Sequence, residues 1–223
     1  MIGVVKDIFK WLYIFPKQTI VLNLDKWDTN NPLLITGSSG DGKTTLAKKI
    51  AKEYDAIIIH TDAILLRLCC SKDMLIKNYH SLLFENDEYM IDAEYLKAHE
   101  YLPYNTTNTR IIKSIEETRE YTIDYIDWIG KYMLDNYPDK LYIIEGNDIC
   151  ALELEYLCNK PLILLGSSRL LSFYRRIRRN VVDEHKGLIY SIYRQIVKYN
   201  KVFRKLDRRK EYVYSKLKHY EKK

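Results

Sequence analysis

The feature that most constrains this chain is a short glycine-rich segment. Residues 37–44 read Gly-Ser-Ser-Gly-Asp-Gly-Lys-Thr and match the phosphate-binding loop pattern G-x-x-x-x-G-K-[ST] in full. The apolar residues 33–36 before it have the composition of a buried parallel strand, and residues 44–52 after it have the apolar spacing of a helix. A strand, a glycine-rich turn and a helix in this order surround one anion with backbone N–H groups and the positive end of a helix. The segment therefore predicts a binding site for a nucleotide triphosphate.

The residues of this loop, called the P-loop below (residues 37–44), have distinct expected tasks. The glycines permit backbone torsions and close approach that a side chain would block. Lys43 is expected to reach the β- and γ-phosphates, and the hydroxyl of Thr44 is expected to ligate Mg²⁺. ATP and Mg²⁺ are therefore the predicted ligands. The residues predicted to bind the nucleotide are Gly37, Ser38, Ser39, Gly40, Asp41, Gly42, Lys43, Thr44 and Thr45.

Apolar runs alternate with helical segments along the rest of the chain. Strands are expected at residues 19–24, 33–36, 56–60, 141–146 and 162–166, and helices at residues 2–15 and through most of 63–137. Parallel neighbours cannot be joined by a tight turn, so this alternation predicts an α/β fold with a parallel sheet, right-handed crossovers and flanking helices. Ligands of such sheets bind at the carboxyl ends of the strands, which directs attention to polar residues there.

Two carboxylates stand at predicted strand ends. Asp62 follows the strand at residues 56–60, and Glu145 closes the strand at residues 141–144. A parallel strand that is buried on both faces leaves no place for an acid except at its end. Phosphoryl transfer to an alcohol needs a carboxylate that accepts the hydroxyl proton, together with oxygen ligands for Mg²⁺. We assign the base role to Asp62, which also suits a helix N-cap, and the metal or water-shell role to Glu145.

Arginines form the third element of the predicted site. Residues 173–180 read Phe-Tyr-Arg-Arg-Ile-Arg-Arg-Asn, which places Arg175 on one helical face with Arg178 and Arg179. Guanidinium groups on adjacent turns suit a lid that closes over phosphates and neutralises charge in the transition state. The alternative is a solvated basic helix.

These segments resemble the P-loop kinases of the uridine kinase and phosphoribulokinase type. The likeness lies in residues 37–45, in Asp62, in Ile-Ile-Glu-Gly at 143–146, and in residues 175–180, where that family has Arg-Arg-Ile-x-Arg-Asp. The resemblance implies a P-loop NTPase fold with a helical lid. It makes Asp62 the catalytic base and Arg176 and Arg179 the lid arginines, alongside Lys43. The sequence departs from the family at Asn180, which stands in place of Asp, and at residues 64–66, where Ile-Leu-Leu replaces an aromatic pair.

Length and composition set the domain organisation. At 223 residues the chain fits one domain with an appendage. We expect a kinase domain at residues 1–187, in which 63–140 form a helical acceptor-binding insertion and 169–187 the lid, followed by a basic segment at 188–223. No run of about 18 apolar residues predicts a membrane span, and the four cysteines lack C-x-x-C spacing. The expected location is the cytoplasm, without a membrane partner.

The C-terminal segment carries most of the positive charge. The net charge is +6, but residues 169–223 alone hold 18 Lys/Arg against 5 Asp/Glu. Apolar residues recur there at seven-residue intervals in two series: Ile189, Ile196, Phe203 and Leu217, with Lys210 in the missing place, and Ile192, Tyr199, Leu206, Val213 and Tyr220. This heptad pattern predicts a long basic helix. Its stripe could pack on the kinase domain, form a coiled-coil homodimer, or leave the basic face for nucleic acid.

Two classes of function follow from these observations. The first is an ATP-dependent kinase that transfers the γ-phosphoryl group to a hydroxyl of a small molecule such as a nucleoside or a sugar. A polynucleotide 5′-hydroxyl kinase is a variant of this class, because the basic tail could follow a phosphate backbone. Nucleic acid is not the favoured partner, because aromatic and basic residues do not interleave outside the tail. The second class is a regulatory protein whose nucleotide state controls a partner. The sequence identifies neither the acceptor nor a preference between ATP and GTP.

Overall fold

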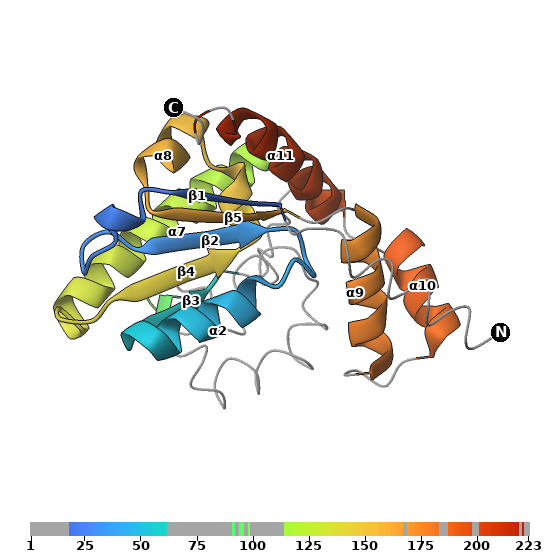
Figure 1. The fold of residues 1–223 in the computed structure, drawn as a ribbon, viewed down its shortest axis with the longest axis horizontal. Coiled ribbons are helices and arrows are strands. Elements are labelled where there is room, and N and C mark those ends of the chain that lie inside the picture. Colours follow the sequence, from blue (N-terminus) through green and yellow to red (C-terminus); the bar gives the residue numbers. More distant parts are fainter. Residues whose placement is uncertain are drawn as a thin grey trace.

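The fold is taken from a computed structural model, which describes residues 18–61, 91, 94–95, 98, 114–166, 169–182, 187–197, 201–218 and 220. Its centre is a five-stranded sheet (Figure 1). The strands are β1 (Gln18–Leu22), β2 (Leu33–Gly37), β3 (Ile57–His60), β4 (Tyr142–Gly146) and β5 (Leu162–Gly166), in the spatial order β1-β5-β2-β4-β3. Strands β2, β3, β4 and β5 are parallel, and β1 adds an antiparallel edge beside β5. The predicted α/β fold with a parallel sheet is thus confirmed for β2, β3, β4 and β5, whereas the antiparallel pairing of β1 was not predicted.

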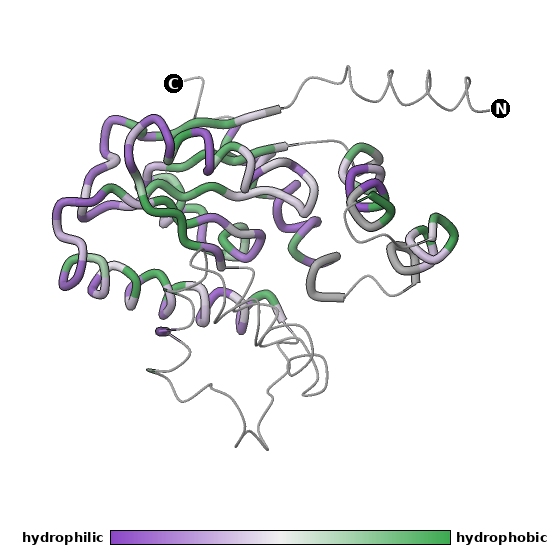
Figure 2. The backbone as a smooth tube through the Cα atoms, turned by 90° about the horizontal axis from the view of Figure 1, so that it is seen from below, coloured by the Kyte–Doolittle hydropathy of each residue, from purple (hydrophilic) through white to green (hydrophobic). Residues whose placement is uncertain are grey.

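Helices cover both faces of this sheet. On one face, α2 (Lys43–Tyr54) buries Ala47 and Ala51 against Leu33 and Ile35 of β2. On the other face lie α7 (Ile115–Asn136), the 3₁₀ helix η3 (Asp148–Ala151), α8 (Leu154–Asn159) and α11 (Lys201–Leu217). Successive strand residues point to opposite faces of the sheet. Because helices cover both faces, every residue of β2, β4 and β5 is buried. Figure 2 shows the resulting hydrophobic strands at the centre.

Local sequence signals explain where the helices begin and end. The Oγ of Ser114 accepts a hydrogen bond from the backbone N–H of Glu117 at 3.0 Å and so caps α7, whose first turn also carries Glu116. Helix α2 ends at Tyr54, and the next residue, Asp55, adopts the left-handed conformation with φ 53°. Most of the predicted helical insertion at 63–140, and the predicted helix at 2–15, lie outside the described residues. Within the described ranges, no helix combines the length and the hydropathy needed to cross a bilayer.

The C-terminal segment forms two helices that pack against different parts of the chain. Helix α10 (Leu188–Val197) lies beside α9 (Arg169–Val182), whereas α11 packs against η3, α7, α8 and β5 (Figure 1). The single long helix predicted from the heptads therefore differs from the structure, because no one straight helix could follow both surfaces. The stripe of α11, formed by Leu206, Lys210, Val213 and Leu217, is buried within the chain.

Candidate functional site

The P-loop joins β2 to α2 at the carboxyl edge of the sheet. Gly37, Gly40 and Gly42 have positive φ values, and Gly42 immediately precedes the first turn of α2. Gly40, with φ 88°, lies against α9, where a Cβ would be 3.0 Å from the backbone oxygen of Ser172. A side chain at this position would combine an unfavourable torsion with a tight contact, so the glycine is required by the fold. The ends of β3, β4 and β5 meet the loop at the same edge, as parallel strands require.

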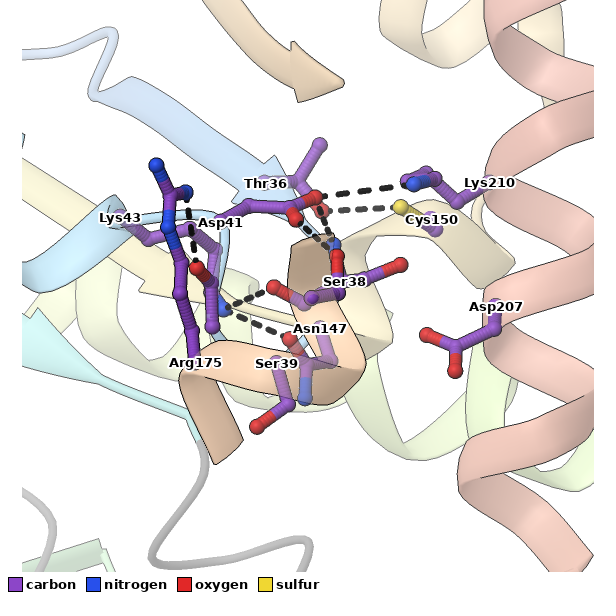
Figure 3. A network of polar contacts seen from close by, with 12 residues as sticks. Thr36, Ser38, Ser39, Asp41, Lys43, Asn147, Cys150, Arg175, Asp207 and Lys210 are labelled. Carbon is purple, nitrogen blue, oxygen red and sulfur yellow. Dashed lines mark hydrogen bonds and ion pairs between the residues drawn. The ribbon is translucent and has the colours of Figure 1, made fainter. Parts of the chain in front are cut away.

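Asp41 is a buried acid inside the P-loop (Figure 3). Its Oδ2 accepts a hydrogen bond from the backbone N–H of Ser38 at 2.7 Å, which closes the turn. Its Oδ1 accepts from the Oγ of Ser172 in α9 at 2.7 Å, and the Nζ of Lys210 in α11 lies 3.6 Å from Oδ2. One side chain thus joins the loop to two helices that are distant in sequence.

Lys43 occupies the first position of α2 and is buried. Its Nζ donates to the Oδ1 of Asn147 at 2.6 Å and, more weakly, to the backbone oxygen of Ser38 at 3.4 Å. Asn147 follows β4 directly, so it reaches the lysine from the neighbouring strand. Figure 3 shows the Lys43 amine held between these two acceptors. The ammonium group is therefore fixed at the loop by neutral oxygens.

Thr44, Glu145 and His60 form the second polar group of the site. The Oγ1 of Thr44 donates to the Oε1 of Glu145 at 2.7 Å, and the Nδ1 of His60 lies 2.6 Å from the same oxygen. Glu145 is 3% exposed. Burial alone would raise the pKa of Glu145, but the His60 hydrogen bond and the charges of Lys43 and His60 outweigh it and lower the pKa. The carboxylate is therefore held in its ionised form.

The remaining oxygen of this carboxylate bears on the predicted Mg²⁺ site. Oε2 of Glu145 is buried, and among the described residues it has no hydrogen-bond partner. Buried carboxylate oxygens are normally paired, so this one fits a ligand such as a metal ion as its partner. Mg²⁺ is usually bound by one or two protein oxygens together with phosphates and waters. The Thr44 hydroxyl and Glu145 offer that donor set. No cluster of three or more His, Cys, Asp or Glu suited to a metal occurs in the part of the chain that the structure describes.

Two arginines of the predicted lid segment, Arg175 and the predicted lid arginine Arg176, contact the P-loop from α9. The Nη1 of Arg175 donates to the backbone oxygen of Gly40 at 3.0 Å, and the Nη1 of Arg176 donates to that of Ser39 at 3.3 Å. Arg176 is buried, and its Nη1 also lies 3.7 Å from the Oδ2 of Asp207 in α11. Arg178 is exposed, and the side chain of Arg179 is not among those described. Both arginines therefore bind the loop through its backbone oxygens.

The structure brings only some of the predicted residues together. Lys43, Thr44 and Glu145 lie close to one another at the start of α2. Thr45 is exposed on α2. Asp62, the predicted base, lies outside the described residues.

Four functional candidates were not predicted: His60, Asn147, Asp207 and Lys210. His60 and Asn147 stand at strand ends, as Glu145 does, so the same rule could have indicated them. Lys210 is visible in sequence as the polar break in the heptad stripe. Asp207 carries no comparable signal.

The sequence was compared with known protein families and with curated proteins. Neither a scan against models of protein families nor a search of curated proteins produced a match.

Proposed function

We propose that this protein is a P-loop kinase that binds ATP with Mg²⁺ and transfers the γ-phosphoryl group to a hydroxyl of a small molecule. The observation that carries the proposal is the meeting of Lys43, Thr44 and Glu145 where the P-loop enters α2. A phosphate at a helix N-terminus is stabilised by backbone N–H groups and by the helix dipole. The strand order and the loop are consistent with a P-loop NTPase fold.

Each side chain has a role that its position supports. Lys43 would exchange Asn147 and the Ser38 carbonyl for phosphate oxygens, a stronger charge-assisted interaction. Thr44 and Glu145 would hold Mg²⁺, which when bound neutralises phosphate charge. His60 would orient Glu145, since its ring donates to the oxygen shared with Thr44. Phosphoryl transfer depends mainly on such positioning and charge stabilisation.

The arginines of α9 favour transfer over simple nucleotide binding. Arg175 and Arg176 already lie on the P-loop and carry permanent charge, so they would oppose the negative charge that develops on the phosphates during transfer. Asp62 remains the proposed base, because in the sequence it comes two residues after His60, where β3 ends at the same edge of the sheet as the P-loop. The acceptor is proposed as a nucleoside or sugar hydroxyl, by resemblance to the uridine kinase type.

The first test is binding and turnover by wild-type protein and by Lys43→Ala. Wild type should bind Mg·ATP in a calorimetric titration and release ADP with at least one member of a panel of nucleosides, nucleotides, sugars and 5′-hydroxyl oligonucleotides. Lys43→Ala should abolish ADP release and weaken binding, because it removes the ammonium at the loop. Lys49→Ala is the matched control, since Lys49 is exposed on the same helix.

The outcomes separate the candidate functions. Wild-type turnover in Lys43→Ala would refute the role given to the P-loop. Binding of ATP without transfer to any acceptor would favour a nucleotide-dependent regulatory protein, a second candidate supported by the contact between α11 and the loop. Transfer to oligonucleotides alone would identify a polynucleotide kinase.

A further inference from the structure

The P-loop is contacted by a helix from the far end of the chain. Helix α11 places Lys210 beside Asp41 of the loop (Figure 3). It also places Asp207 beside Arg176 of α9. Lys210 is 5% exposed and Arg176 is also buried. Both contacts come from consecutive turns of one helix, so a single element reaches the loop and the arginine that binds it.

Packing alone does not explain Lys210. Its neighbours along the buried stripe, Leu206, Val213 and Leu217, are apolar and nearly inaccessible. A leucine at position 210 would continue that stripe, whereas a buried ammonium carries a desolvation cost unless it is paired. The pairing partner is the carboxylate of Asp41, whose side chain is fully buried. The charge is therefore matched to the loop rather than to the helix-packing surface.

Asp41 needs a counter-charge for a reason connected with the ligand. Its Oδ2 fixes the turn of the P-loop by accepting the Ser38 N–H. The same negative charge lies within the loop that is proposed to bind phosphates, and neighbouring like charges repel strongly inside a protein. Lys210 offsets that repulsion while leaving the hydrogen bond in place. Asp41 can then shape the loop with less cost to anion binding.

Asp207 acts on the other side of the loop. Its Oδ2 lies 3.7 Å from the Nη1 of Arg176, the same nitrogen that donates to the backbone oxygen of Ser39. Two oxygens at one nitrogen limit the rotation of the guanidinium group, whose donors form a rigid planar fork. Asp207 thus fixes the buried arginine against the loop.

We propose that α11 is part of the nucleotide site, with Lys210 and Asp207 as positioning residues that keep the P-loop and Arg176 in the geometry that binds the triphosphate. This inference rests on the proposed nucleotide binding and deepens it. It follows by linkage that a nucleotide bound at the P-loop stabilises the docking of α11, and that loosening α11 weakens nucleotide binding by the same factor.

The test measures calorimetric binding of Mg·ATPγS to variants of the full chain. Lys210→Met keeps the length and apolar packing of the side chain and removes its charge. Its affinity should fall about tenfold, within the range of roughly 2- to 150-fold expected for coupled contacting groups. Lys210→Arg should recover part of the loss. Lys216→Met, which removes an exposed charge from the same helix, should bind as wild type does.

A double-mutant cycle isolates the ion pair. Asp41→Asn combined with Lys210→Met removes both charges, so the double variant should bind more tightly than the product of the two single effects predicts. Strictly multiplicative effects would overturn the pairing. Asp207→Asn should lower the turnover number more than it raises the KM for ATP, because it acts through the orientation of Arg176. Equal effects on both would overturn the role given to Asp207.

A measurement on wild-type protein guards against variants that fail to fold. Hydrogen exchange of the amides at residues 206–213 should slow when Mg·ATPγS is added. Failure of wild type to bind ATPγS would refute the proposed function and this inference together. Binding by wild type, with unchanged exchange in α11 and unchanged affinity in Lys210→Met, would refute the inference alone.

Discussion

Replacing Gly146 with alanine should strongly destabilise the protein. Gly146 ends β4, between the site residues Glu145 and Asn147, and its missing side chain leaves room for Thr61. A Cβ at this position would overlap the Oγ1 of Thr61 and lie 2.5 Å from the Oδ1 of Asp148 and 2.9 Å from the Cβ of Thr61. The Thr61 hydroxyl donates to Asp148, so the methyl group would enter a buried hydrogen bond.

The structure sets the size of this effect. Overpacking a rigid interior costs about 1–3 kcal/mol. Loss of a hydrogen bond to a charged group costs about 1.5–3 kcal/mol more. Asp148 keeps its second partner, the Oγ1 of Thr122 at 2.9 Å, so the carboxylate is not left bare. We expect Gly146→Ala to lower the free energy of unfolding by about 3–5 kcal/mol, a large part of the roughly 5–15 kcal/mol typical of a domain.

Gly130 provides the matched control. It lies inside α7, and the nearest atom to a Cβ there is the hydroxyl of Tyr142 at 3.8 Å, an ordinary contact. Alanine is the better helix former, so Gly130→Ala should raise the free energy of unfolding by about 0.5–1 kcal/mol. The same chemical change is thus expected to act in opposite directions at two glycines.

Urea unfolding followed by far-UV circular dichroism measures both variants. A shift of the midpoint at constant slope reports stability itself. In the background Thr61→Ala, which removes the nearest obstructing atom, Gly146→Ala should cost less than it does in wild type. If Gly146→Ala unfolds at the wild-type midpoint, Thr61 and Asp148 do not occupy the space beside β4, and the assigned geometry of the site is wrong.

Three further predictions concern the C-terminus, pH and catalysis. A chain ending at Gly187 should unfold at lower urea concentration, because burial of Leu206, Val213 and Leu217 contributes about 1.5–3 kcal/mol of stability for each side chain. Because the folded protein lowers the pKa of Glu145, this group contributes stability at pH values above 4.5, its usual pKa, and that stability is lost as the pH falls below 4.5. Urea titrations at pH 7 and pH 4 should therefore show a smaller loss of stability at pH 4 for Glu145→Gln than for wild type. Asp62→Asn should leave ATP affinity intact and lower turnover by roughly 10²–10⁴-fold. If calorimetric ATP binding and turnover fall by the same factor, Asp62 is not the catalytic base.

The parts of the site that the sequence predicted share one property, which is that local rules determine them. The P-loop is a contiguous pattern, and its flanking strand and helix follow from apolar spacing over a few residues. Glu145 was found because an acid at the end of a buried strand has few other places to be. In each case the neighbours that decide the structure are also neighbours in sequence.

The contacts that sequence reasoning missed depend on which strands lie side by side. Lys43 meets Asn147, 104 residues later, because β2 pairs with β4 rather than with β3, the next strand in sequence. His60 reaches Glu145 because β4 also pairs with β3. Alternating strands and helices predict a parallel sheet but not its strand order, so the partners of a strand-end residue stay undetermined.

The heptad stripe shows how a correct pattern can leave its partner open. Its periodicity correctly indicated that Leu206, Val213 and Leu217 share an apolar face, but periodicity is the same whether that face meets the same chain or another. The break at Lys210 was the more informative position. A charge inside a buried stripe is unfavourable unless something opposite requires it, and what lies opposite is an acid of the P-loop. A polar residue that interrupts an apolar period is therefore a reason to look for a site across the interface, even when the rest of the helix serves only to pack.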